Sequence, residues 1–161
     1  MKIVVNDKSA EGELNLIPDP VSTFSAEDKN ENSEAVARTF RMQEELATLM
    51  DSVMAEKNIL EPVKDAASVV AEYLDSIEAI RGNLVPVKTG RSVLFADEER
   101  LRDKVTDVYF GVNFYEGRPT TSQSETLNKL QRDMNTEKQK LEERKKVYRP
   151  KVKEEIGRAH V

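Results

Sequence analysis

The sequence predicts a mainly α-helical fold, an antiparallel helical bundle preceded by a β-hairpin. Of its 161 residues, 34% are charged and only 6% are aromatic, a balance typical of helix-rich chains with exposed charged faces. Apolar residues recur at helical spacing along most of the chain, and patterns that favour helix starts precede them. Because tryptophan is absent, the core is expected to consist of leucine, valine, isoleucine, alanine and methionine.

Residues 1–20 are expected to form a β-hairpin that is a remnant of an upstream β-sandwich. Lys2–Val5 is a short β-prone run, residues 6–12 are rich in turn formers, and residues 13–17 alternate apolar and polar side chains. Pro18–Pro20 ends the second strand, because proline cannot donate to a ladder. A lone hairpin is marginal in water, so we expect this one to be unstable without a further sheet.

The helical region is expected to span residues 21–155. Its first helix should run from about residue 26 or 34 to about residue 57. Ser25 and Asp28 have the spacing of a capping box, although the weak helix formers that follow also allow a start at Ser33. An apolar stripe at helical spacing supports this helix, and its members are Val36, Phe40, Leu46, Leu49, Met50 and Val53.

A second helix is expected to begin near Pro62, which suits a first turn, and to stop at Gly82. The short link between the first two helices favours an antiparallel pair. We expect this pair to supply the main core, with the most buried residues being Leu46, Leu49, Val53, Val70, Leu74 and Ile77.

Two further helices are expected in the second half of the chain. Asp97 is a good N-cap for a short helix, with Leu101, Val105 and Val108 facing inward. Residues 111–121 are expected to be a loop.

Ser122–Glu125 has capping-box spacing and should open a long fourth helix. That helix carries a weak, coiled-coil-like stripe formed by Leu127, Leu130, Met134, Leu141 and Tyr148. Glu137 and Arg144 occupy two of its seam positions.

Charge and composition exclude several classes of function. The net charge of −5 argues against bulk attraction to nucleic acid or anionic membranes, and no apolar run reaches the length of a membrane span. The chain has no cysteine, and His160 is its only histidine. Thiol catalysis, disulfides, histidine-based metal sites and catalytic triads are therefore excluded. We predict no catalytic, cofactor-binding or metal-binding residue and no cofactor.

Two charged clusters have ordinary structural explanations. Asp97, Glu98, Glu99 and Asp103 could be read as paired carboxylates, but their place at a helix start favours capping. Lys138–Lys153 could contact phosphates, but interleaved acids favour a solvated helix face.

The candidate interaction residues are four aromatic residues that lie within seven positions of one another. They could form a platform for a carbohydrate or a peptide. The interpretation that we favour is a plug that packs the loop onto the helices. The four residues are Tyr109, Phe110, Phe114 and Tyr115.

Two short motifs precede predicted helices. Ile17–Pro20 follows a predicted strand, and Gly111–Gln123 leads into the fourth helix. Together they resemble the C-terminal region of bacterial sortilin/VPS10-like BNR-repeat β-propeller proteins, which are often labelled glycosyl hydrolases. In that family an Asp-Pro strand end is followed by a helical region with a Pro-Thr-x-x-Gln-like helix start. Pro119–Gln123 matches this start and Asp19-Pro20 matches the strand end, but Val21 stands where a basic residue is common.

The resemblance implies a fragment of an exported protein, located in the periplasm, at the cell surface or outside the cell. Its partners would be upstream β-propeller and β-sandwich domains of the same chain, with possible self-association. The active site of such a protein would lie in the propellers, so no catalytic residue is carried over. Residues 156–161 spell a peptide that a sequencing adapter encodes, and we expect them to be a non-native, mobile tail.

We therefore expect a non-catalytic helical structural or interaction segment of a larger exported β-propeller protein. One alternative is the C-terminal part of a glycoside hydrolase-like enzyme whose active site lies upstream. Another is a basic helix that binds anionic surfaces or nucleic acid.

Overall fold

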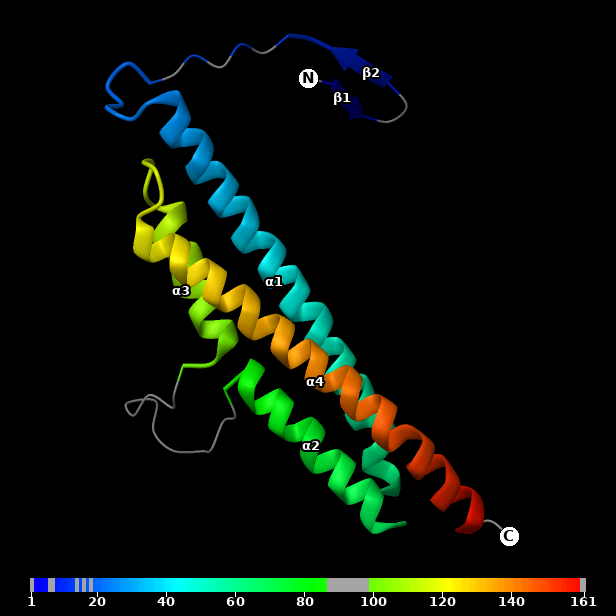
Figure 1. Ribbon diagram of the computed structural model, residues 1–161. Coiled ribbons are helices and arrows are strands. Elements are labelled where there is room, and N and C mark those ends of the chain that lie inside the picture. Colours follow the sequence, from blue (N-terminus) through cyan, green and yellow to red (C-terminus); the bar gives the residue numbers. More distant parts are fainter. Residues whose placement is uncertain are drawn as a thin grey trace, which may run out of the picture.

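The computed structural model confirms a mainly α-helical chain preceded by a β-hairpin (Figure 1). It describes residues 2–5, 8–13, 15, 17, 19–86 and 99–159. The described elements are β1 (Lys2–Val5), β2 (Lys8–Glu11), α1 (Ala26–Leu60), a 3-10 turn η1 (Glu61–Val63), α2 (Ser68–Leu84), α3 (Leu101–Asn113) and α4 (Thr121–Ala159).

The helices form a bundle of three rods. Two of the rods are α1 and α4, and the third, which consists of α2 followed by α3, is broken. Figure 1 shows α1 and α4 running in the same direction, with α2 and α3 end to end and antiparallel to both. Both short helices pack against both long ones. The antiparallel pairing that we expected for the first two helices is therefore present, and α3 continues the path of α2 toward the start of α1.

The N-terminal hairpin differs from the expected one. β2 is Lys8–Glu11 and pairs antiparallel with β1, whereas Glu13, Asn15 and Ile17 belong to no strand. Only Asn6 and Asp7 separate the two strands in sequence, and this residue pair favours tight turns. The nearer strand closes a smaller loop at a lower entropic cost, which explains the shift. That the hairpin is the remnant of a sandwich stays a prediction.

The start of α1 follows a local sequence signal, whereas the end of α2 is set by packing. The capping box at the start of α1 is confirmed: the Ser25 hydroxyl accepts a hydrogen bond from the backbone N–H of Asp28 at 3.0 Å, and the later start at Ser33 is wrong. Gly82 does not stop α2, which continues to Leu84. Leu84 is fully buried and extends the apolar stripe of Ile77 and Ile80 by one more turn, so packing overrides the glycine.

The start of α3 lies later than expected. Asp97 and Glu98 fall outside the described residues, and Glu99 precedes a helix whose N-cap is Arg100. The backbone N–H of Arg100 donates to the Asp103 carboxylate at 3.1 Å, so the acid that caps this helix lies inside it. Because α3 ends at Asn113, the loop before α4 is shorter than expected.

The core residues are mostly those expected, with two exceptions. Leu74 is only partly buried and Phe40 is exposed, whereas Tyr73 is almost completely buried. Along α4 the expected stripe is confirmed, and its Glu137 is buried, but Arg144 is exposed and its neighbour Lys145 is partly covered. The core consists of Ala35, Met42, Leu46, Leu49, Val53, Leu60, Val70, Tyr73, Ile77, Ile80, Leu84, Leu101, Val105, Val112, Leu127, Leu130, Met134 and Leu141.

The capping box of α4 lies two residues before the expected Ser122–Glu125. The backbone N–H of Gln123 donates to the Thr120 hydroxyl at 3.2 Å, and the Gln123 side chain accepts from the backbone N–H of Thr120 at 2.8 Å. Thr120→Ala is expected to lower the free energy of unfolding by about 1 kcal/mol. Ser122→Ala is the matched control and should change it by less than about 0.5 kcal/mol. Urea denaturation measures both, and equal effects would contradict this cap.

Candidate functional site: an exposed aromatic ridge held by a clasped loop

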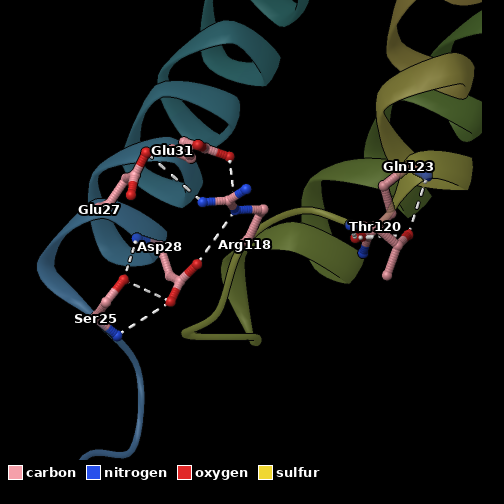
Figure 2. A network of polar contacts seen from close by, with 7 residues as sticks. All are labelled: Ser25, Glu27, Asp28, Glu31, Arg118, Thr120 and Gln123. Carbon is pink, nitrogen blue, oxygen red and sulfur yellow. Dashed lines mark hydrogen bonds and ion pairs between the residues drawn. The ribbon is translucent and has the colours of Figure 1, made fainter.

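The loop that joins α3 to α4, residues 114–120, is held against the start of α1 by ion pairs (Figure 2). The guanidinium of Arg118 lies 3.2 Å from the Asp28 carboxylate and 3.1 Å from that of Glu31, with Glu27 at 3.8 Å. These three acids share the first turns of α1, where carboxylates also favour the helix dipole. One arginine on the loop therefore contacts three acids on one face of α1.

Uncharged contacts hold the same loop. The Asn32 side chain donates a hydrogen bond to the backbone carbonyl of Tyr115, and the Tyr115 ring meets the Phe24 ring edge-on with centroids 5.5 Å apart. Gly117 is buried, and a Cβ atom there would stand 2.6 Å from the Phe24 ring. Glycine at this position lets the loop backbone approach the ring closely.

The far end of the loop is fixed to α3. The Gln123 side chain, which also caps α4, donates to the backbone carbonyl of Gly111 at 3.0 Å. The loop is thus attached to α1 on one side and to α3 on the other, so the last turn of α3 is held in place from both directions. Below, these contacts are called the loop clasp: Arg118 with its three acids, Asn32 with Tyr115, and Gln123 with Gly111.

The last turns of α3 and the neighbouring turn of α1 carry a continuous row of aromatic rings. The centroids of Phe40 and Tyr109 are 5.1 Å apart, those of Tyr109 and Phe110 are 5.4 Å apart, and those of Phe110 and Phe114 are 5.8 Å apart. Phe40 and Phe110 are each 49% exposed, and Phe114 is 78% exposed. We call Phe40, Tyr109, Phe110 and Phe114 the aromatic ridge.

The structure divides the four aromatic residues singled out from the sequence between two roles. Tyr109, Phe110 and Phe114 belong to the aromatic ridge, whereas Tyr115 packs the loop onto Phe24. The sequence analysis missed Phe40 as a surface residue, because it lies on a helical stripe that otherwise enters the core. The position of Phe40 in the sequence does not indicate that it is exposed. Its place on the ridge follows from its contact with Tyr109, a residue of another helix.

The pKa of the Asp28 carboxyl group offers a test of the loop clasp. Hydrogen bonds from Ser25 and, next, the charge of Arg118 hold this pKa below its usual range. We expect Ser25→Ala to raise the pKa more than Arg118→Gln does, because the hydrogen bond from the Ser25 hydroxyl, which this change removes, is the largest single cause. Carbon-13 NMR titration of the carboxyl group measures it, and a larger rise in Arg118→Gln would contradict this order.

The sign of the pH dependence follows from the same shift. Because the folded state lowers the Asp28 pKa, these contacts stabilise it fully above the unfolded value of 3.8 and are lost as the pH falls through the folded value. Below that pH, the Asp28 carboxylate no longer contributes to the loop clasp.

Three of the eight bases in the stretch Lys138–Lys153 of α4 pair with acids. Lys140 pairs with Glu137 at 2.7 Å and Lys145 with Glu142 at 2.9 Å, while Arg149 pairs with Glu56 of α1. These pairs reduce the positive charge that the stretch could offer to phosphates.

Neither a cluster of metal-ligating side chains nor a long apolar helix occurs in the part of the chain that the structure describes. It contains no group of three or more histidine, cysteine, aspartate or glutamate side chains that could hold a metal ion. None of its helices has a stretch both long and apolar enough to cross a bilayer.

Comparisons with known proteins return no relative for this chain. No family model matches it, and neither does any curated protein or solved structure. The resemblance to sortilin/VPS10-like propeller proteins therefore stays a prediction.

Proposed function

We propose that this chain is a non-catalytic helical interaction module that self-associates through the aromatic ridge. One observation carries the proposal: Phe110 and Phe114 are stacked on each other at the end of α3, where Phe110 is about half exposed and Phe114 largely exposed to solvent. Aromatic residues are enriched at protein interfaces, and contiguous exposed apolar patches mark such sites.

The size of the ridge suits a contact between two copies. Three of its rings are half exposed or more, and fully burying an aromatic side chain removes about 150–250 Å² from water, so the ridge offers roughly 300–400 Å² of ring surface. A stable interface buries about 800 Å² on each partner. The rings of the ridge alone supply roughly half of that area, which predicts a weak, reversible dimer. A two-fold contact would place the ridge of one copy on that of the other.

The loop clasp favours binding because it orders the surface beforehand. Phe114 is the first residue after α3 and would otherwise belong to a loop free to move. Contacts on both sides hold this loop, so little further ordering is needed when a partner binds, and less entropy is lost.

Sedimentation velocity over about 10 µM to 1 mM tests the proposal, a range that covers reversible dimers. The wild-type chain is expected to sediment increasingly as a dimer, and Phe114→Ser should raise the dissociation constant by about 30-fold, the effect of losing roughly 2 kcal/mol at a hot spot. Val147→Ser is the control, since Val147 is an exposed apolar residue on α4, outside the ridge. A wild-type chain that stays monomeric, or equal effects of the two variants, would overturn the proposal.

We also propose, on the resemblance alone, that this module belongs to a larger exported β-propeller protein. The helix start at Thr121 supports this, because Thr120 and Gln123 of the Pro-Thr-x-x-Gln-like motif are the residues that cap it. Sequencing the source gene upstream of Met1 tests whether the module belongs to such a protein. Asp-box repeats are expected there, and an upstream sequence without them would remove it while leaving the self-association proposal standing.

A further inference from the structure

A groove between α1 and α3 continues the aromatic ridge toward the start of α3, and its volume is about 480 Å³. One wall is formed by Thr106 and Arg102, which lie three and seven residues before Tyr109 on α3. The other wall includes Ala47, which lies seven residues after Phe40 on α1. Side chains at these spacings share one face of a helix, so the ridge and the groove belong to one continuous surface.

The groove has an apolar lining. Leu46 and Met50 of α1 and Val85, the residue after α2, contribute to it. Leu46 belongs to the buried core, whereas Met50 and Val85 are only partly buried and keep apolar surface in contact with water. Ala47 is exposed, and its single methyl group leaves room beside Met50 for a larger side chain. An aromatic ring placed there would remove apolar surface of both groups from water.

The groove and the outer end of the ridge lie at similar distances on opposite sides of the contact between Phe40 and Tyr109. Since a helix rises about 1.5 Å per residue, Phe114 lies about 8 Å from this contact toward the start of α1. The middle of the groove, between Thr106 and Arg102, lies about 8 Å from the contact in the opposite direction. A two-fold axis through the contact would therefore place the outer end of each ridge over the groove of the other copy.

We infer that Phe114 of each copy inserts into the groove of a second copy. The inference rests on the proposed self-association and adds its geometry, a two-fold axis between Phe40 and Tyr109. Because α1 and α3 run antiparallel side by side, this axis lays α3 of one copy across α1 of the other, with Phe114 beside Ala47 (Figure 1). The ring of Phe114 is 78% exposed in the single chain, and the groove supplies apolar area that the rings of the ridge alone lack.

Cross-linking of single-cysteine variants tests this geometry, because the chain has no cysteine of its own. Ala47→Cys places a thiol in the groove and Asn113→Cys places one beside Phe114, both at exposed positions. In the inferred dimer, position 47 of one copy lies close to position 113 of the other, whereas equivalent positions lie about 15 Å or more apart. A short ethylene-linked bis-maleimide should therefore join the two variants mainly when they are mixed. As much covalent dimer from Asn113→Cys alone, or none from the mixture, would overturn the inference.

Filling the groove separates this inference from the proposed function. Ala47→Gln adds bulk at an exposed helical position, where glutamine is nearly as good a helix former as alanine, so the fold should persist. In sedimentation velocity it should raise the dissociation constant by at least about 10-fold, whereas Ala71→Gln, at an exposed position of α2 outside the groove, should leave it unchanged. If Phe114→Ser weakens the dimer but Ala47→Gln does not, the inference fails and self-association stands. A wild-type chain that stays monomeric overturns both.

Discussion

Replacing Ile77 with alanine is expected to lower the free energy of unfolding by about 2–5 kcal/mol, because the change leaves a cavity in the core. Ile77 has 0% exposure and lies on the face of α2 that enters the core between α1 and α4. Urea denaturation followed by far-ultraviolet circular dichroism measures the loss, provided that the slope with denaturant stays the same.

The matched control is Leu74→Ala, on the same helix. The sequence alone predicts the full core penalty there, but Leu74 is only partly buried, so its side chain already contacts water in the folded state. We expect a loss clearly smaller than that of Ile77→Ala. A larger loss for Leu74→Ala would show that α2 packs in the register expected from the sequence.

Replacing Arg149 with methionine is expected to lower the free energy of unfolding by about 2–3 kcal/mol at pH 7, because it strips a buried carboxylate of its charged partner. Glu56 of α1 is buried and accepts hydrogen bonds from Arg149 of α4 and from the Tyr73 hydroxyl of α2, the latter at 2.7 Å. The Tyr73 ring also stacks on Tyr148 with centroids 5.1 Å apart. The cluster therefore joins three helices, and methionine keeps much of the arginine volume.

The pH dependence of this effect follows from the pKa of Glu56. Burial alone would raise that pKa, but the hydrogen bonds from Arg149 and Tyr73 outweigh burial and hold it below its usual value. The stabilisation is therefore complete above the unfolded pKa of 4.5 and is lost as the pH falls through the lower folded value. The difference between wild type and Arg149→Met should shrink as Glu56 becomes protonated.

Arg144→Met is the control for this prediction. Arg144 lies on the same helix but is exposed, so its loss should change stability by less than about 0.5 kcal/mol. Urea denaturation at pH 7 and near pH 3 compares the variants. A loss in Arg149→Met that stays equal at both pH values would mean that packing, and not the ion pair, supports the cluster.

The cluster also raises the pKa of Tyr73. Burial and the hydrogen bond to the Glu56 carboxylate both disfavour the phenolate. Tyr73 is therefore a neutral donor at physiological pH, which explains how a tyrosine replaces an aliphatic residue in the core of α2. Its hydroxyl group has a partner, so burying the ring leaves no donor unpaired.

The sequence by itself determined the features that depend on neighbours along the chain. The capping box of Ser25 and Asp28, the apolar stripes of α1 and α4, and the antiparallel return of α2 all follow from local spacing. The density of aromatic residues likewise indicated Tyr109, Phe110 and Phe114 as candidate interaction residues, although the favoured interpretation there was a plug that packs the loop onto the helices. Such signals depend only on residues a few positions apart, so the sequence contains all the information that they need.

The tertiary structure decided which side chains meet across helices. The spacing of apolar residues cannot distinguish Tyr73 from Leu74 as the core residue of α2. The choice depends on Glu56 of α1, which accepts the hydrogen bond of the Tyr73 hydroxyl group. Spacing also cannot show that Phe40 joins the aromatic ridge, or that Ala47 lines a groove, since both depend on where α3 begins and ends. Local patterns set the helices, whereas burial and surface contacts are properties of pairs distant in sequence.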